Sequence, residues 1–238
     1  MLTAATLSLC TVASANTITA TGSNGPNWNV SCPGGNPATC VVGDPSVFAI
    51  KSATLTTNDT GGVSANIFTN FGDATLTSFN DVGLTLFPAD MIITASGGAE
   101  YAIVLDGHGG LVTGGLYSIT GTETAQTVLG NPGGVTYRNT LAVWANPSGA
   151  VLLGTGIVGI TGFGNGATNP EYDVSVTGIT GGAALYNAGT ISFELASATC
   201  GNGVVFGSSV PEPATWTLML AGAALIVAAK TGKRLRRT

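Results

Sequence analysis

Short runs in which apolar and polar residues alternate dominate the chain between residues 16 and 209. Residues 190–195 place Ile, Phe and Leu on one face, and residues 172–177 repeat the pattern. A period of two is typical of a half-buried β-strand. Further strand candidates are 82–87, 91–95, 100–105, 115–120, 140–144 and 156–160.

Turn-forming residues separate these runs. Gly, Asn, Asp and Pro cluster at 106–107, 131–134, 146–149 and 164–166, and such clusters break strands. No amphipathic helix of useful length and no internal repeat interrupts the pattern. We therefore predict an all-β body, an antiparallel β-sandwich of jelly-roll-like form, with a barrel or a β-helix as alternatives.

Composition agrees with a strand-rich exported protein. Only 8% of the residues are charged and 36 of the 238 are Gly, whereas about 25% are charged in a typical soluble domain. Before residue 210, the two basic residues Lys51 and Arg138 face eleven acidic ones, a formal net charge of −9. Such a body repels phosphate backbones, so nucleic acid is excluded as a partner.

The N-terminus resembles the second half of a secretory signal peptide. An apolar stretch leads to Ala13-Ser14-Ala15, an A-x-A cleavage pattern. Leu2 directly follows Met1 without a basic n-region, which we attribute to a misassigned start or a truncated chain. We predict a signal peptide over 1–15 and Asn16 as the first mature residue; a buried first strand is the alternative.

The C-terminal segment combines three elements in order. It opens with Pro211, Glu212 and Pro213, and the prolines hold an extended stretch that a protease can bind as a strand. An uncharged run follows at 214–229, which as a helix would be about 24 Å long. Trp216 lies where an interfacial aromatic anchor belongs.

A basic cluster closes this segment and predicts a stop on the cytoplasmic side of a membrane. Its members are Lys230, Lys233, Arg234, Arg236 and Arg237. A helix packed on the β body would need an amphipathic stripe, but the run is apolar all round except at Thr215 and Thr217. We therefore predict a membrane-anchoring helix over 214–229, although about 20 residues are usual for a span.

The stretch VPEPATWTLMLAGAALIVAAKTGKRLRRT resembles a PEP-CTERM sorting domain, in the variant with Trp three residues after the second Pro. The resemblance covers about 210–238, with Thr217 where Ala is usual. It implies export by a Gram-negative bacterium, a transient stage in the inner membrane and processing by an exosortase, a membrane cysteine protease-transpeptidase. Such proteins typically accompany exopolysaccharide and biofilm loci.

Three cysteines remain after removal of the signal peptide. Cys32 and Cys40 flank a short loop that one disulfide can close, which would leave Cys200 unpaired. A bridge from Cys200 to Cys32 or Cys40 is the other pairing. Three spread cysteines and one histidine lack the paired spacing of a zinc site, so we expect no metal ion.

Candidate catalytic groups are few. His108 is the only histidine, and we interpret it as a hairpin-turn residue, because Asp106 on the same turn cannot form a relay with it. Carboxylate pairs of the kind used by glycosidases can be drawn from Glu171 with Asp173, or from Asp81 with Asp90.

Binding sites for ions are equally sparse. Asn58, Asp59 and Asp73 lie on Gly-rich loops that suit calcium, but no calcium-loop motif contains them. The Gly-rich segments 121–134 and 161–170 lack the basic residue and helix of a phosphate cradle. We expect no catalytic residue and no cofactor.

The chain therefore divides into a signal peptide (1–15), a β-rich mature body (16–209) and a sorting and anchor segment (210–238). The expected function is that of a non-enzymatic surface or extracellular-matrix protein associated with extracellular polysaccharide. The alternative is a carbohydrate-binding module or a glycoside hydrolase. A flat platform built from Trp28, Tyr137, Trp144 or Tyr186 would favour sugar binding.

Overall fold

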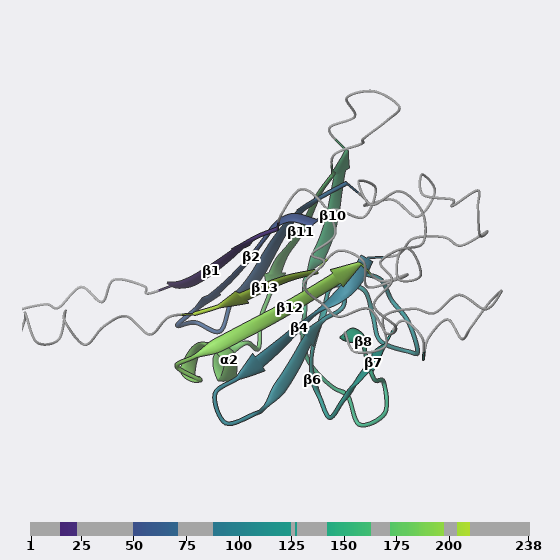
Figure 1. Ribbon diagram of the computed structural model, residues 1–238. Coiled ribbons are helices and arrows are strands. Elements are labelled where there is room, and N and C mark those ends of the chain that lie inside the picture. Colours follow the sequence, from purple (N-terminus) through teal and green to yellow (C-terminus); the bar gives the residue numbers. More distant parts are fainter. Residues whose placement is uncertain are drawn as a thin grey trace, which may run out of the picture.

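The computed structural model describes residues 15–22, 50–70, 88–124, 127, 142–162, 172–197 and 204–209. These residues form antiparallel β-sheets and one five-residue helix, α2 (Ala183–Asn187) (Figure 1). The prediction of an all-β body is confirmed. Within the described ranges, no helix has the length and apolar character needed to cross a membrane; the predicted anchor helix at 214–229 lies outside them.

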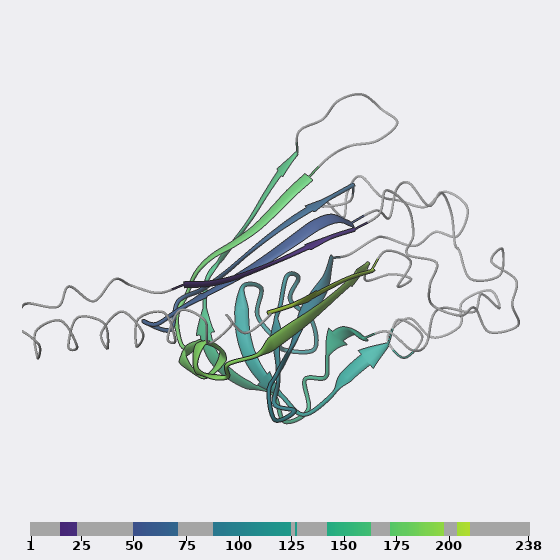
Figure 2. The same ribbon diagram turned by 60° about the vertical axis from the view of Figure 1, so that its left-hand side comes forward.

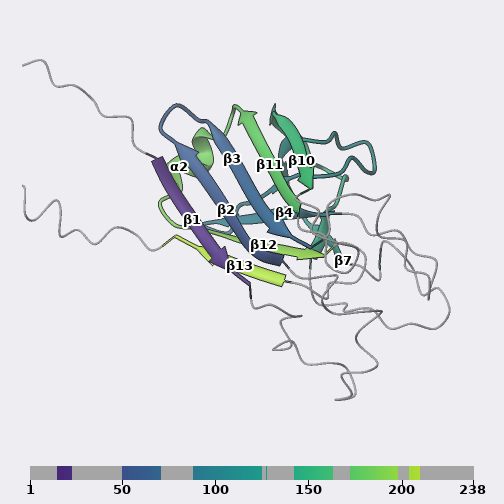
Figure 3. The ribbon, with the colours of Figure 1, turned by 90° about the horizontal axis from the view of Figure 1, so that it is seen from above.

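The first sheet has five strands in the order β1-β2-β3-β11-β10, which lie side by side in Figure 3. Its strands are β1 (Ala15–Thr21), β2 (Ile50–Asn58), β3 (Val63–Thr69), β11 (Tyr172–Ile179) and β10 (Ile157–Gly162). All neighbours are antiparallel.

The second sheet has six strands in the order β13-β12-β4-β5-β6-β9. They are β13 (Val204–Ser208), β12 (Ile191–Ser197), β4 (Pro88–Ala95), β5 (Glu100–Ile103), β6 (Gly115–Ile119) and β9 (Val151–Thr155). A separate two-stranded ribbon pairs β7 (Thr122–Thr124) with β8 (Ala142–Ala145), and β8 packs against β4 and β12.

The two large sheets form the two layers seen in Figure 2, and their inward side chains share one hydrophobic core. Leu55 on β2 and Val176 on β11 meet Ile93 on β4 and Phe193 on β12 in this core. All four are 2% exposed or less. Burial of such side chains contributes about 1.5–3 kcal/mol each, so inter-sheet packing holds the layers together.

A second, smaller apolar cluster lies on the opposite face of the six-stranded sheet. Successive strand residues alternate between faces; Met91 and Ile93 point into the main core, whereas Ile92 joins the second cluster. Its other members come from β5, β6, β8 and the segment 104–114, and are Ala102, Val104, Leu111, Tyr117, Ile119 and Ala145. The ribbon and this segment therefore cover part of the outer face.

Ser209 fixes the end of β13. Its backbone N–H donates to the Ile191 carbonyl at 2.8 Å, and its Oγ accepts from the Ile191 N–H at 2.8 Å. Strands β1 and β13 lie against each other, and the start of β1 and the end of β13 are at the same end of the body (Figures 1 and 3).

Most strands predicted from alternation are present. The predictions at 91–95, 100–105, 115–120, 140–144, 156–160, 172–177 and 190–195 correspond to β4, β5, β6, β8, β10, β11 and β12. The candidate at 82–87 lies outside the described residues. Strands β1, β2, β3, β7, β9 and β13 were not predicted.

Strand β2 shows why the alternation was weak. Its inward positions include Ala53 and Thr57, which carry little hydrophobic signal, and its register with β3 shifts between Ile50 and Ser52. Such a shift breaks the period of two that identifies a strand.

We predict that Ile93→Ala lowers the free energy of unfolding of the full chain by about 2–5 kcal/mol, because it leaves a cavity between the sheets. The matched control is Ile157→Ala on β10, where the side chain is 75% exposed and the change should stay within about 0.5 kcal/mol. Urea unfolding followed by far-UV circular dichroism measures both. Equal losses in the two variants would contradict the assigned core.

Candidate functional site

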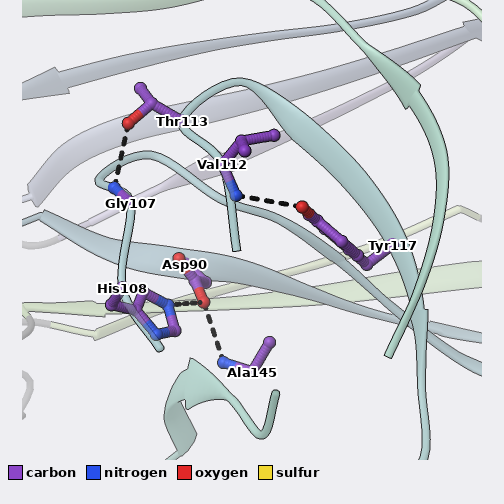
Figure 4. A network of polar contacts seen from close by, with 7 residues as sticks. All are labelled: Asp90, Gly107, His108, Val112, Thr113, Tyr117 and Ala145. Atoms are coloured by element: carbon purple, nitrogen blue, oxygen red, sulfur yellow. Dashed lines mark hydrogen bonds and ion pairs between the residues drawn. The ribbon is translucent and has the colours of Figure 1, made fainter. Parts of the chain in front are cut away.

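The most unusual polar cluster joins three segments on the outer side of the six-stranded sheet. Asp90 comes from β4, His108 from the β5–β6 connection and Trp144 from β8. Figure 4 shows Asp90 between His108 and the backbone of Ala145. The Asp90 carboxylate thus connects β4 to the 104–114 segment and to β8.

The Asp90 carboxylate is completely buried, yet it makes two short hydrogen bonds through Oδ2. His108 Nε2 lies 2.8 Å from this oxygen, and the Ala145 N–H donates to it at 2.8 Å. Whichever partner carries it, one proton between Nε2 and Oδ2 satisfies both atoms. Asp90 and His108 therefore form a hydrogen-bonded pair in apolar surroundings.

Burial raises the pKa of the Asp90 carboxyl above its ordinary value. The hydrogen bond and charge of His108, and the backbone amides of Ala145 and Leu105, lower that pKa but do not cancel the effect of burial. Oδ1 has no hydrogen bond of good geometry with any described residue. An isolated buried carboxylate is costly, so His108 and Ala145 are what make this position tolerable.

The imidazole of His108 is also held by an aromatic ring. Its plane stacks on the Trp144 indole with ring centroids 4.4 Å apart and an angle of 14° between the planes. Only 10% of the His108 side chain is exposed. The stacking positions Nε2 toward Asp90 and covers one face of the indole.

The segment 104–114 folds into a compact loop that presents His108. Gly109 and Gly110 have φ values of 55° and 90°, which glycine adopts at little cost. Two side chains then fasten the loop to itself and to β6, as Figure 4 shows: Gly107 N–H donates to Thr113 Oγ1, and Val112 N–H to the Tyr117 hydroxyl, both at 2.9 Å.

A His–Asp pair serves in acyl transfer only when the other imidazole nitrogen faces a nucleophile. Among the described residues, that nitrogen has no hydrogen bond to a hydroxyl or thiol. Nor does any group of three or more potential metal-ligating side chains occur in the described ranges. What the described residues do show is that Asp90 joins β4 to the 104–114 segment through His108 and to β8 through Ala145.

His108 lies on the connection between the antiparallel strands β5 and β6, as expected of a hairpin-turn residue, but its hydrogen bond to Asp90 was not predicted. His108 is nearly buried, and its partner is Asp90, eighteen residues earlier, rather than Asp106. Alternation places Asp90 on the outer face of β4, but nothing in a linear pattern says that the loop after β5 folds back over it.

Other predicted residues are dispersed. Asp173 lies on β11 and accepts a hydrogen bond of 3.4 Å from Asn66, while its proposed pair Glu171 is outside the described residues. Asn58 Oδ1 accepts from the Gly62 N–H at 2.7 Å and thereby closes its own turn. Asp73 and Asp81 also lie outside.

The aromatic residues do not assemble into one platform within the described chain. Trp144 stacks on His108, whereas Tyr186 lies on α2 at the other end of the sheets (Figure 1). Several residues singled out in the sequence lie outside the described residues. They are Trp28, Tyr137, Cys32, Cys40, Cys200, the sorting residues Pro211, Glu212, Pro213 and Trp216, and the basic cluster.

Comparison with known proteins identifies one segment. The model of the PEP-CTERM protein-sorting motif matches residues 209–237, which confirms the resemblance of the C-terminal segment. The match starts at the residue that follows β13. Neither the curated proteins nor the solved structures contain a significant match to this chain.

We predict that Asp90→Asn removes a distinct pH dependence of stability. Because the Asp90 pKa is raised in the folded state, the folded protein binds this proton more readily than the unfolded chain. Its stabilising contribution is present at low pH and is lost as pH rises from about 4, the ordinary aspartate range, through the raised folded pKa.

The measurement is the free energy of unfolding across a pH series for the parent and for Asp90→Asn. The difference between the two curves should change between the ordinary aspartate pKa and the raised pKa of the folded state, and level off above it. Asp106→Asn, on the same loop, is the matched control and should retain the parent's slope. If the free energy of unfolding changes with pH in the same way for the parent and for Asp90→Asn, the predicted contribution of the Asp90 carboxyl group is wrong.

Proposed function

We propose that this chain serves as a non-enzymatic component of the extracellular polysaccharide matrix. Its PEP-CTERM sorting motif makes it an exported exosortase substrate, destined for the cell surface of a Gram-negative bacterium. The observation that carries the proposal is the sorting motif directly after the last strand of a β body. A jelly-roll-like sandwich and a transient stage in the inner membrane, anchored through residues 214–229, belong to the same proposal.

The surface chemistry of the body supports this role. Exposed threonines pair across β1 and β2, with Oγ1 atoms 3.2 Å apart for Thr17 and Thr56 and 3.3 Å apart for Thr19 and Thr54. A hydroxyl-covered, weakly charged sheet is compatible with a hydrated sugar polymer. Lys and Arg are scarce before residue 210, so acidic macromolecules are poor partners.

The buried Asp90–His108 pair fits a structural rather than a catalytic role. Its carboxylate is fully enclosed, and one face of the imidazole is covered by Trp144. A catalytic residue must contact its substrate, whereas a pair of residues that only joins two segments of the chain needs no access from solvent.

We predict that replacing Pro211 and Pro213 together by Ala blocks processing, because the rigid extended element before the apolar run is lost. The double variant should insert but remain unprocessed in the inner membrane. Thr217→Ala is the matched control in the same segment, and it should be processed like the parent. Membrane fractionation with an epitope in the body separates the outcomes; efficient surface display of the double variant would contradict the prediction.

A deletion strain tests the role in the matrix. Loss of the gene should reduce the polysaccharide retained in a biofilm, and the full chain should restore it. A chain ending at Ser209 should not, because it lacks the sorting segment. Unchanged retention of polysaccharide in the deletion strain would argue against a matrix function.

A further inference from the structure

Other described residues cover part of the outer face of the six-stranded sheet. Strand β8 packs against β4 and β12, and together with the loop 104–114 it buries the second apolar cluster. Over β12, β13 and the end of β4 the described residues instead leave a shallow pocket of about 230 Å³. This is below the 300–1,000 Å³ typical of sites for drug-sized ligands, so the pocket suits a single small unit.

Strand register places the pocket's polar groups in a row. Thr94 pairs with Ser192, and Ser192 pairs with Ser208, so three hydroxyls cross three adjacent strands. With neighbouring strands about 4.8 Å apart, the row is about 10 Å long. Thr94 and Ser208 are exposed and Ser192 is half-buried.

The next row supplies an aromatic ring and a carboxylate. Phe206 is 56% exposed and pairs with Glu194. Two residues along a strand cover about 6.6 Å, which separates Phe206 from Ser208. Between the rows, Phe193 and Gly207 contribute backbone to the pocket floor, because their positions point inward.

We propose that this pocket binds one sugar unit of a neutral polysaccharide. The apolar C–H face of the sugar ring packs on Phe206, and its hydroxyls exchange hydrogen bonds with Thr94, Ser192 and Ser208. This inference rests on the proposed matrix function and names the ligand class and the site through which the protein acts.

The chemistry of the lining selects this ligand. A sugar ring offers an apolar face together with a rim of hydroxyls, and the pocket offers an exposed aromatic ring 6–7 Å from a row of hydroxyls, about the spacing of alternate residues in a strand. The chain before residue 210 carries a formal net charge of −9, which disfavours an acidic polymer.

A single exposed hydrophobic side chain is ordinary on a protein surface. Ile157 is 75% exposed on β10 and marks no site by itself. Phe206 differs because it lies in the same pocket as four polar side chains. The comparison of these two residues therefore provides the test.

The experiment measures binding of the purified full chain, in mild detergent, to dextran, laminarin, hydroxyethyl cellulose and the acidic polymer alginate by isothermal titration calorimetry. We expect saturable binding to at least one neutral polymer and none to alginate. Phe206→Ala should weaken that binding about tenfold or more, since a packed aromatic contact is lost. Phe206→Trp should retain it, and Ile157→Ala should match the parent.

The hydroxyl row is tested by Ser192→Ala combined with Ser208→Ala, which should weaken binding about threefold to tenfold. Unchanged melting temperatures would show that the variants fold. Absence of binding to every neutral polymer, preferential binding of alginate, or parental affinity in Phe206→Ala would overturn the proposal.

These results are separable from those of the deletion strain. If a strain carrying Phe206→Ala retains polysaccharide like the parent while the deletion strain does not, the pocket fails and the matrix function stands. If the pocket binds a neutral polymer but deletion leaves the matrix unchanged, the matrix function fails and the binding site stands.

Discussion

The burial of one carboxyl group, that of Asp90, in apolar surroundings constrains much of this structure. Asp90 has no access to water, so its carboxylate must be satisfied by groups brought to it from elsewhere in the chain. The amide of Ala145 and the imidazole of His108 meet that need. In doing so they hold β8 and the 104–114 loop against the outer face of the sheet, whereas Phe206 on the edge strand β13 is exposed.

The sequence pattern predicted those strands whose inward positions carry bulky apolar residues. Alternation along β11 and β12 is strong because bulky apolar residues fill their inward positions, and both strands were found. Alternation is weak along β2, where Ala53 and Thr57 face the core and a register shift intervenes between Ile50 and Ser52. Tertiary burial defines this strand, and a single sequence does not display it.

The sorting segment and the polar clusters of the β body differ in the same way. The sorting segment is a linear signal, read by an enzyme as a stretch of chain, so residue order alone was sufficient to identify it. The Asp90–His108 pair and the Thr94–Ser192–Ser208 row are products of strand pairing and loop folding. Their members stand 18, 98 and 16 residues apart in the sequence, and no spacing rule connects them.

The hydrogen bonds between Ser209 and Ile191 also have a mechanical meaning. A force applied to the chain at Ser209 acts on the end of an edge strand. A pull along β13 loads in shear all five residue pairs that join it to β12, whereas a sideways pull opens them one after another from Ser209. The strength of the attachment then depends on the direction of the force.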